Sequence, residues 1–374
     1  MKEGWKYKNL GDLCDVLDKR RKPITKESRI SGSIPYYGAT GVLDYVQDYI
    51  FDGRFLLVGE DGAKWGKYDN TAYIIEGKSW VNNHVHILKM HEDVLDTFVQ
   101  YYLNVKDLNP YITGAVVPKL TQAALVGIPI PVPPLAEQER IVAELDLLSG
   151  IIDKQNAQLK ELDTLAQSIF YDMFGNPVEN DKGWSLKRIE DTCLNIVDCP
   201  HSTPKKVGEI TPYPCIRTSE LKDGCISWDT MQYLDEAEYR IRIARLAPKA
   251  GDIVFAREGT IGDAAILPEG YHFSLGQRTM LLRVNPSIIS NVFLHRVIIS
   301  EWVKKQIRIV NVSSTVAHVN IKDFKQFVIP IPPIALQQSF ASKIAVIEQQ
   351  KKSINQSIAE SQKLFDYTMD KYFS

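Results

Sequence analysis

The sequence has no long run of apolar residues, although 44% of its 374 residues are hydrophobic. A helix that crosses a membrane needs about 18 or more consecutive apolar residues, so we expect no membrane segment. The first residues, Met1–Trp5, also lack the apolar core of a signal peptide. We therefore expect a cytoplasmic protein.

Cysteine is scarce, with five residues at Cys14, Cys193, Cys199, Cys215 and Cys225. Their number is odd and none forms a C-x-x-C pair, which argues against a disulfide framework and against a zinc site. We expect free thiols, as is typical of a protein in a reducing compartment.

A surplus of charge is missing too, because 44 basic and 46 acidic side chains give a formal net charge of −2. That balance argues against a histone-like or polybasic protein. It does not exclude nucleic acid as a partner, because a local basic face can be hidden within a neutral total.

The sequence patterns of common catalytic sites are also absent. No G-x-x-x-x-G-K-[ST] phosphate loop occurs, and no G-x-G-x-x-G, G-x-S-x-G or H-E-x-x-H is present. Asn109–Ile112 resembles an amino-methyltransferase motif but lacks its second proline. Four loop carboxylates, Glu60, Asp61, Asp252 and Glu258, leave a nuclease metal site open, but ordinary turn carboxylates are the simpler interpretation. We expect neither a catalytic residue nor a metal ligand in this chain.

What the chain does have is an internal repeat of one pattern in two unequal copies. Repeated order along a sequence indicates duplicated structural units. The matched pairs are Gly4-Trp5 with Gly183-Trp184, Pro35-Tyr36 with Pro212-Tyr213, Gly62 with Gly259, Asn83–Leu88 with Gln277–Leu282, Lys119 with His318, and Pro133-Pro134-Leu135 with Pro332-Pro333-Ile334.

Each copy begins with a part in which short runs of β-branched and aromatic residues are broken by Gly, Pro, Asn and Asp. The predicted strands are Phe55–Val58, Thr71–Ile75, His84–Leu88, Asp252–Phe255 and Thr279–Val284, and helices are predicted near Asp93–Asn104 and Ile289–Gln306. This is a mixed α+β pattern and not a regular βαβ alternation. The predicted segments are residues 1–134, 135–175, 176–334 and 335–374.

Each copy ends in a long helix that starts after a Pro-Pro pair. Apolar residues recur there at alternating steps of four and three, which makes a narrow stripe, with polar Gln155 as the one interruption in the first helix. A helix of about 40 residues spans roughly 60 Å and needs a partner to cover such a stripe. The residues predicted to pair are Leu145, Leu148, Ile152, Leu159, Leu162, Ile344, Ile347, Ile354, Ile358 and Phe365.

The two helices can pair in parallel or antiparallel. An antiparallel pair relates the two globular parts by an approximate two-fold axis, whereas a parallel pair crowds them at one end, so we favour the antiparallel coiled coil. Residues 135–175 carry three basic and eight acidic side chains. Because such a helix repels DNA, we expect its exposed face to meet protein.

Side chains suited to nucleic acid occur at matching places in the two copies. In the first copy, Lys19–Lys22 is a basic run, and Asn82, Asn83 and His84 stand at the start of a predicted strand. Asn and Gln can bind adenine through two hydrogen bonds, and Arg can bind guanine in the same way. The alternative interpretation is a solvated surface run and ordinary strand capping.

In the second copy, Pro200–Lys206 combines hydroxyl, imidazole and ammonium donors, and Gln277 and Arg278 match the strand start above. Thr113–Leu120 and Val312–Val319 are small and polar, and each ends near a basic residue. The complete candidate set for DNA contact is Lys19, Arg20, Arg21, Lys22, Tyr37, Lys64, Asn82, Asn83, His84, Lys119, His201, Thr203, Lys205, Lys206, Arg217, Arg257, Gln277, Arg278, Ser314 and His318.

Several segments together resemble a known family. Ile34–Ala39 with Asp52-Gly53 is similar to one form of its recognition domain, and Asp198–Pro204 with Gly251–Val254 and Gly259–Gly262 is similar to another. Ile128–Gln138, which reads IPIPVPPLAEQ, is the most specific piece, and Ile329–Gln337 repeats it with Leu336 in place of Glu137. On these residues the chain resembles the specificity subunit of a type I restriction–modification system over nearly all its length.

The resemblance implies two tandem recognition domains, each followed by a long helix, with pseudo-two-fold symmetry. Each domain is then expected to read one half of a bipartite double-stranded DNA target, while the helices set the gap and dock two methyltransferase subunits. A translocase–endonuclease subunit is the further expected partner. S-adenosylmethionine, ATP and Mg²⁺ are expected on the partner subunits, with no cofactor in this chain. A protein adaptor without DNA binding and a stand-alone nuclease or methyltransferase are the alternatives.

Overall fold

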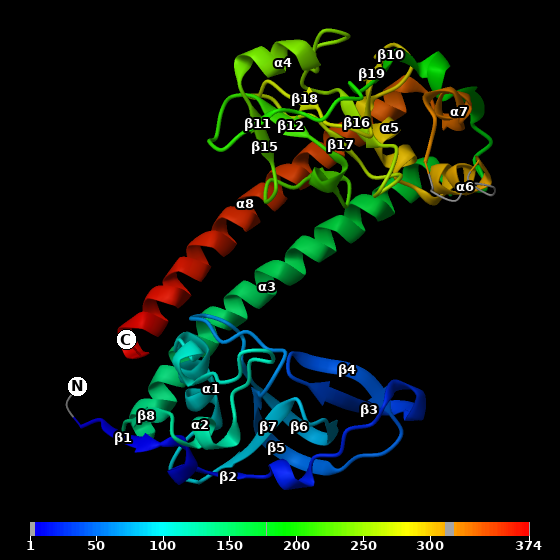
Figure 1. The fold of residues 1–374 in the computed structure, drawn as a ribbon. Helices are drawn as coiled ribbons and strands as arrows, with labels where there is room; N and C mark the ends of the chain where they lie inside the picture. Colours follow the sequence, from blue (N-terminus) through cyan, green and yellow to red (C-terminus); the bar gives the residue numbers. More distant parts are fainter. Residues whose placement is uncertain (1–3, 177, 311–317, 374) are drawn as a thin grey trace. The chain divides into compact units, whose positions relative to one another are not determined.

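The computed structural model describes residues 4–176, 178–310 and 318–373, and the chain divides into two compact units (Figure 1). Unit 1 is Met1–Ala157 with Ile354–Ser374, and unit 2 is Gln158–Ser353. Each unit therefore combines one globular part with segments of both long helices. The finer division into residues 1–134, 135–175, 176–334 and 335–374 stays a prediction.

Unit 1 is built on a six-stranded sheet whose buried strands follow from runs of β-branched and aromatic residues. The strand order is β2 (Cys14–Val16), β7 (Val85–Met90), β5 (Phe51–Gly59), β6 (Ala72–Val81), β3 (Ser31–Gly38) and β4 (Gly41–Val46). All neighbours are antiparallel except β3 and β6. A second, two-stranded sheet pairs β1 (Lys6–Asn9) with β8 (Pro129–Val132). The three strands predicted in this copy are present.

Two helices complete the globular part of unit 1, α1 (Asp96–Val105) and α2 (Gln122–Val126). Phe98 and Val105 of α1 are buried against Ile141 and Leu145. The other apolar face of α1 packs on the sheet, where Val99, Tyr102 and Leu103 join the main core. The predicted helix at Asp93–Asn104 is thus confirmed, because its apolar residues repeat with helical spacing on two faces.

Unit 2 carries a smaller version of this sheet plus additional short strands. One sheet has the order β10 (Cys193–Asp198), β19 (Thr279–Val284), β16 (Ile253–Ala256) and β17 (Ala264–Ile266), and another has β11 (Lys206–Val207), β15 (Gln232–Leu234), β12 (Pro214–Ile216) and β18 (Ser274–Leu275). The remaining pairs are β9 (Ser185–Arg188) with β20 (Val328–Ile331), and β13 (Leu221–Lys222) with β14 (Cys225–Ile226). Both predicted strands of this copy are present.

The helices of unit 2 are α4 (Glu236–Arg242), α5 (Asn291–Ile298), α6 (Glu301–Val310) and α7 (Ile321–Gln326). The single helix predicted at Ile289–Gln306 is wrong, because the segment breaks between α5 and α6. At the break, the Ser300 hydroxyl donates to the Val297 carbonyl at 2.6 Å. A serine that bonds to the backbone in this way competes with continuation of the helix.

Turns of 3-10 helix connect several of these elements in both units. They are η1 (Leu10–Asp12), η2 (Asp18–Arg20), η3 (Lys26–Ser28), η4 (Asn109–Tyr111), η5 (Ile189–Thr192) and η6 (Thr218–Glu220).

Strand register corrects one pair of the sequence repeat. Tyr36 lies beside Trp80 in the parallel pair β3–β6, and Cys215 lies beside Ser274 in the parallel pair β12–β18. Tyr36 therefore corresponds to Cys215, and the predicted match with Tyr213 is two residues too early. Tyr213 lies before β12, where its ring stacks on Tyr239.

The long helices are α3 (Leu135–Phe174) and α8 (Ile334–Phe373), each of 40 residues. In unit 1, Arg140 of α3 donates to the Tyr372 hydroxyl at 3.1 Å and Gln155 donates to Ser357 at 2.7 Å. Moving forward along α3 thus moves backward along α8. Among the described helices, none combines the length and low polarity that a bilayer crossing requires.

Unit 2 shows the same reversed order between the other halves of the two helices. Asp163 of α3 pairs with Lys351 of α8 at 2.8 Å, and the Phe170 ring lies 5.6 Å from the Phe340 ring. The residues of the predicted stripe are buried or half-buried along both helices. Gln155 of the α3 stripe and Lys351 of the α8 stripe are polar, and both bond to the facing helix.

A buried glutamine ties the start of each long helix to its globular part. Gln138 accepts a hydrogen bond from Leu95 N at 2.8 Å, and its amide donates to the carbonyls of Asp93 at 3.2 Å and Pro133 at 3.0 Å. Gln138 is fully buried. Because all three partners are backbone groups, this side chain fixes the helix start against the segment that precedes α1.

Gln337 does the same in unit 2. It accepts from Ser290 N at 2.8 Å and donates to the carbonyls of Ile288 at 3.3 Å and Pro332 at 2.8 Å. The repeat is therefore present in side-chain hydrogen bonds as well as in strand register.

Replacing either glutamine by leucine should destabilise the fold, because the change keeps the volume but leaves three backbone groups, one of them in a buried hydrogen bond, without partners. We expect each of Gln138→Leu and Gln337→Leu to lower the free energy of unfolding by about 2–4 kcal/mol. Urea unfolding followed by circular dichroism measures this. Gln349→Leu, at an exposed position of α8, is the control and should change little; an equal loss in the control would contradict the assignment.

Candidate nucleic-acid interface

In unit 1 the segments that carry the candidate residues meet at one end of the six-stranded sheet (Figure 1). Asn82 N donates to the Tyr37 carbonyl at 3.1 Å, and Glu60 N donates to the His84 carbonyl at 2.9 Å. Leu120 N in turn donates to the Glu60 carbonyl at 2.8 Å. We call these segments, around residues 37–40, 60–64, 82–84 and 113–120, the unit 1 loop cluster.

The basic run Lys19–Lys22 enters this cluster but its members differ in environment. Lys19, Arg20 and Lys22 are exposed, whereas the side chain of Arg21 is only 14% exposed. Arg21 lies 2.7 Å from a Glu60 carboxylate oxygen and also contacts Asp18 at 3.3 Å. The run therefore contains one buried ion-pair partner among three solvent-facing cations.

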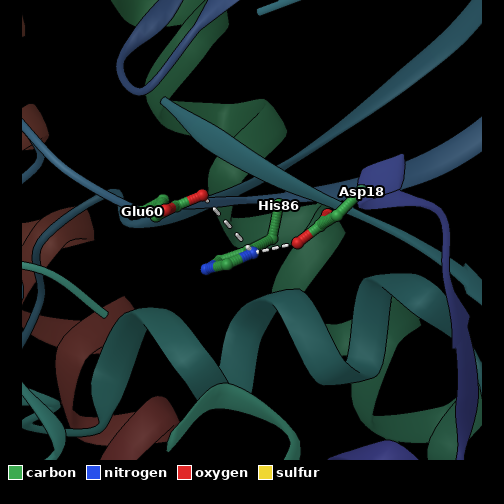
Figure 2. Close-up of side chains that lie close together, drawn as sticks. All are labelled: Asp18, Glu60 and His86. Carbon is green, nitrogen blue, oxygen red and sulfur yellow. Dashed lines mark hydrogen bonds and ion pairs between the residues drawn. The ribbon is translucent and has the colours of Figure 1, made fainter. Parts of the chain in front are cut away.

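Beside Arg21 lies the one group of side chains in the described structure with the donor types of a metal site, Asp18, Glu60 and His86 (Figure 2). His86 Nε2 is 2.7 Å from the Leu120 carbonyl oxygen, which can only accept, so Nε2 carries a hydrogen. His86 Nδ1 is 2.5 Å from Asp18 Oδ2. Both ring nitrogens are thus engaged with protein oxygens, and the guanidinium of Arg21 contacts both carboxylates.

The other candidates of unit 1 fall into buried and exposed groups. Asn82 is buried and accepts from His84 N at 2.8 Å, which closes the turn between β6 and β7. Asn83, His84 and Lys64 are exposed at the cluster surface. The position of Asn82 favours the capping interpretation for this residue, and Asn83 and His84 are the side chains that face solvent.

Charge at the surface of this cluster is organised around one aspartate. Lys119 Nζ lies 2.8 Å from Asp61, and His84 Nδ1 is hydrogen-bonded to the same carboxylate. Although partial burial opposes the effect, these hydrogen bonds hold the pKa of Asp61 below its usual range. Tyr37 lies nearby with its ring 6.1 Å from that of Tyr73, and burial raises the pKa of Tyr37.

In unit 2, a hollow of about 420 Å³ brings several candidates together. Thr203 comes from the loop after β10, Lys206 begins β11, Arg217 follows β12, and Gln277 and Arg278 form the turn before β19. Thr218, Ser219 and Gln232 also line this hollow. Sequence reasoning missed these last three, because Thr218 and Ser219 lie in η6 and Gln232 lies in β15, and together they form no local motif.

The turn before β19 presents its side chains in a fixed way. Arg278 adopts a left-handed backbone with φ of +68°, an uncommon conformation for a residue with a side chain. Its guanidinium pairs with Glu258 at 3.0 Å and remains 64% exposed. Gln277 donates to the His201 carbonyl at 2.7 Å, which ties the turn to the loop after β10.

The remaining candidates of unit 2 are placed as follows. Arg217 binds Glu220 at 3.1 Å within its own turn, and Arg257 is buried against Asp198 at 3.0 Å. His201 and Lys205 are exposed. Ser314 lies outside the described residues, and His318 forms an isolated bridge with Glu258 that matches the bridge of Lys119 with Asp61.

The four carboxylates that left a nuclease site open each have a basic partner. Glu60 and Asp61 pair as described above, Asp252 binds Arg283 at 2.7 Å, and Glu258 binds Arg278. The described side chains therefore favour ion-pair roles for them over metal binding.

The basic run contains exposed lysines and one paired arginine, so substitutions within it should affect DNA affinity and fold stability separately. Replacing Lys19 and Lys22 together by alanine should leave stability unchanged and reduce the slope of log affinity against log salt by about one unit for each phosphate no longer bound. Arg21→Ala should instead destabilise the fold by about 3 kcal/mol, because two carboxylates lose their cation. Salt-titrated DNA binding and urea unfolding measure the two effects. Lys89→Ala, at the other end of β7, is the control, and an unchanged slope in the double variant would remove these lysines from the interface.

The sequence is similar to known proteins along most of its length. The model of a family described as "Type I restriction modification DNA specificity domain" matches residues 2–164 and 182–361. A putative type I restriction enzyme specificity subunit of Haemophilus influenzae is 28% identical over 96% of this chain and 93% of its own length. The EcoBI specificity subunit of Escherichia coli is 23% identical over 85% and 72%.

Solved structures agree with the fold. The S subunit of a type I restriction–modification system from M. genitalium superimposes with a TM-score of 0.63, at 12% sequence identity, over 99% of this chain and 96% of that chain. A structure from work on complex assembly and conformational transition of the type I R-M system gives a TM-score of 0.52 at 17% identity, over 100% and 98%.

Proposed function

We propose that this chain, which belongs to the family of type I restriction–modification DNA specificity subunits, reads a bipartite double-stranded DNA target with its two loop clusters. The unit 2 loop cluster consists of the segments around residues 200–206, 217–219, 257–262 and 276–278. Each cluster reads one half of the target. The chain supplies recognition, and the chemistry belongs to other subunits.

The observation that carries this proposal is the repeated turn at the same end of both sheets. The turn presents Asn83 and His84 in unit 1 and Gln277 and Arg278 in unit 2, where strand register makes them equivalent. Amide and guanidinium groups are the side chains that read base edges through paired hydrogen bonds. Because the two turns carry different residues, the two halves of the target differ in sequence.

The long helices set the distance between the two halves in this proposal. Within each unit, the contacts between α3 and α8 run in opposite directions, which supports an antiparallel coiled coil and pseudo-two-fold symmetry. A helix gains 1.5 Å per residue and is stiff when paired, so its length acts as a ruler.

The partners follow from the same proposal. The exposed acidic face of α3 docks protein, and two methyltransferase subunits are the partners that a two-fold arrangement accommodates. These subunits bring S-adenosylmethionine and methylate the DNA, and a restriction subunit brings ATP and Mg²⁺. Solvent-exposed Glu139, Asp153 and Glu161 lie on this face of α3.

Reconstitution with the modification subunit tests the function. The complex should methylate one bipartite sequence, identified by single-molecule sequencing of host DNA. Duplexes of that sequence should then bind more tightly than duplexes with either half altered, and all binding should weaken as salt rises. Binding to no duplex at any salt concentration would favour the protein adaptor, and methyl transfer by the chain alone would favour a stand-alone enzyme.

Lengthening both helices by one heptad tests the ruler. Insertion after Gln155 and after Gln356, near the contact between Gln155 and Ser357, keeps the apolar stripe in phase and adds about 10 Å. At about 3.4 Å per base pair, the preferred gap between the halves should grow by about three base pairs. Methylation mapping of the variant measures the gap. A heptad inserted in α3 alone breaks the pairing and serves as the control, and an unchanged gap in the double insertion would rule out the ruler.

A further inference from the structure

An aspartate at the end of the first sheet strand occupies an equivalent place in both units. In unit 1, the antiparallel strands β2 and β7 pair Val16 with Leu88. Asp18 follows Val16 by two residues and His86 precedes Leu88 by two, so their side chains meet. Figure 2 shows Asp18 facing the His86 ring. The second oxygen of Asp18 accepts from Ile87 N at 3.0 Å. The side chain of Asp18 is 5% exposed, so these contacts replace water almost entirely.

In unit 2, the partner strands β10 and β19 place Asp198 directly opposite Met280. Met280 is the counterpart of His86, because each pairs with the equivalent residue of the next strand, Phe255 and Val58 respectively. Asp198 is therefore the counterpart of Asp18. The sequence repeat did not reveal this match.

The basic residues that pair with the two aspartates stand at non-equivalent positions in the two units. In unit 1 the partners are His86 and Arg21, with Glu60 as a second carboxylate. In unit 2, Arg257 stands at the position of Glu60 and binds Asp198 at 3.0 Å. A poorly hydrated carboxylate is costly unless paired. An aspartate is thus present at this place in both units, although its ion-pair partners differ. This indicates that the aspartate itself, and not one particular ion pair, has a structural role.

The contacts of Arg21, three residues after Asp18, indicate what this structural role is. Arg21 contacts Asp18 and donates to the carbonyls of Val85 at 2.9 Å and Asn83 at 3.4 Å. The guanidinium therefore spans from the buried aspartate to the turn that presents Asn83 and His84. The position of this turn depends on where Asp18 holds Arg21.

The same path exists in unit 2 with different atoms. His201 Nε2 lies 3.2 Å from Asp198, and the His201 carbonyl accepts from the Gln277 side chain at 2.7 Å. Arg245 also donates to the carbonyls of Asp198 and Cys199 at 3.3 Å, which holds this loop in place. In both units, the aspartate connects to the base-reading turn through the residue three positions later.

We propose that Asp18 and Asp198 are positioning residues, each of which holds the base-reading turn of its own unit and thereby controls specificity for one half of the DNA target. This inference rests on the proposed function. Neither aspartate touches DNA, since its carboxylate is occupied within the protein, so it acts through the turn alone.

The test uses the complex of the full chain with the modification subunit and duplexes of the mapped target. Asp18→Asn and Asp198→Asn are compared on the intact target and on targets with one or the other half altered. Each variant should lose discrimination at one half by about tenfold to a hundredfold, the range of one or two base contacts, and keep it at the other half. The dependence on salt should be unchanged, because the cations that face phosphate stay in place.

Exposed aspartates supply the matched controls, Asp15→Asn on β2 and Asp191→Asn before β10, and both should discriminate as the wild type does. Arg21→Lys is a second variant for unit 1, which keeps the charge but loses the fork that reaches two carbonyls. It should lower discrimination at the same half as Asp18→Asn. Hydrogen exchange without DNA should increase at residues 83–85 or 276–278 in the matching variant.

Two outcomes would overturn the inference. One is unchanged discrimination at both halves in both asparagine variants and in Arg21→Lys. The other is an equal loss on every duplex, which indicates general unfolding. A wild-type complex that binds all duplexes equally would instead overturn the proposed function, and the inference with it.

Discussion

A narrow apolar stripe on a helix of 40 residues is the constraint on which the rest of the structure depends. Such a stripe is too apolar for water and too narrow for a globular core, so another stripe has to cover it. The start of α3 is covered by the end of α8 in unit 1, where Leu145 and Met369 share a cluster. Unit 1 is therefore built from two parts of the chain that lie far apart in sequence. Unit 2, by contrast, is a single continuous stretch, Gln158–Ser353.

Buried charge is the second constraint, and the two units meet it differently. At the sheet end of unit 1, two carboxylates lie beside Arg21 and His86, whereas in unit 2 one carboxylate lies beside Arg257. Exchange of an acid for a base at one position, together with loss of the histidine at another, keeps each site close to neutral. The pairing requirement thus restricts which substitutions a duplicated sheet tolerates at this end.

Local periodicity predicted the helices and strands of the fold well. The register between strands that are far apart in sequence could not be predicted in this way. The helix stripe and the strands are visible in the sequence because their spacing is local. The match of Tyr36 with Tyr213 was wrong because a shared Pro-Tyr pair does not fix strand register, which the pairing of Cys215 with Ser274 reveals. Within the candidate site, four adjacent cations look alike in sequence. Arg21 is distinguished by its partners in the fold, among them Glu60, which lies 39 positions away along the chain.

The repeat separates the residues that both units need for stability from the turn residues to which we assign DNA reading. Gln138 and Gln337 make the same three backbone contacts, because any change there would cost stability in the same way in both units. The turn residues are less constrained, since Asn83 faces solvent and the Gln277 side chain makes a single hydrogen bond, to the His201 carbonyl, at the edge of the hollow. A duplicated fold can therefore keep these glutamine contacts unchanged while the residues of its two turns diverge independently. Under the proposed function, such independent divergence is what would give the two halves of the target different sequences.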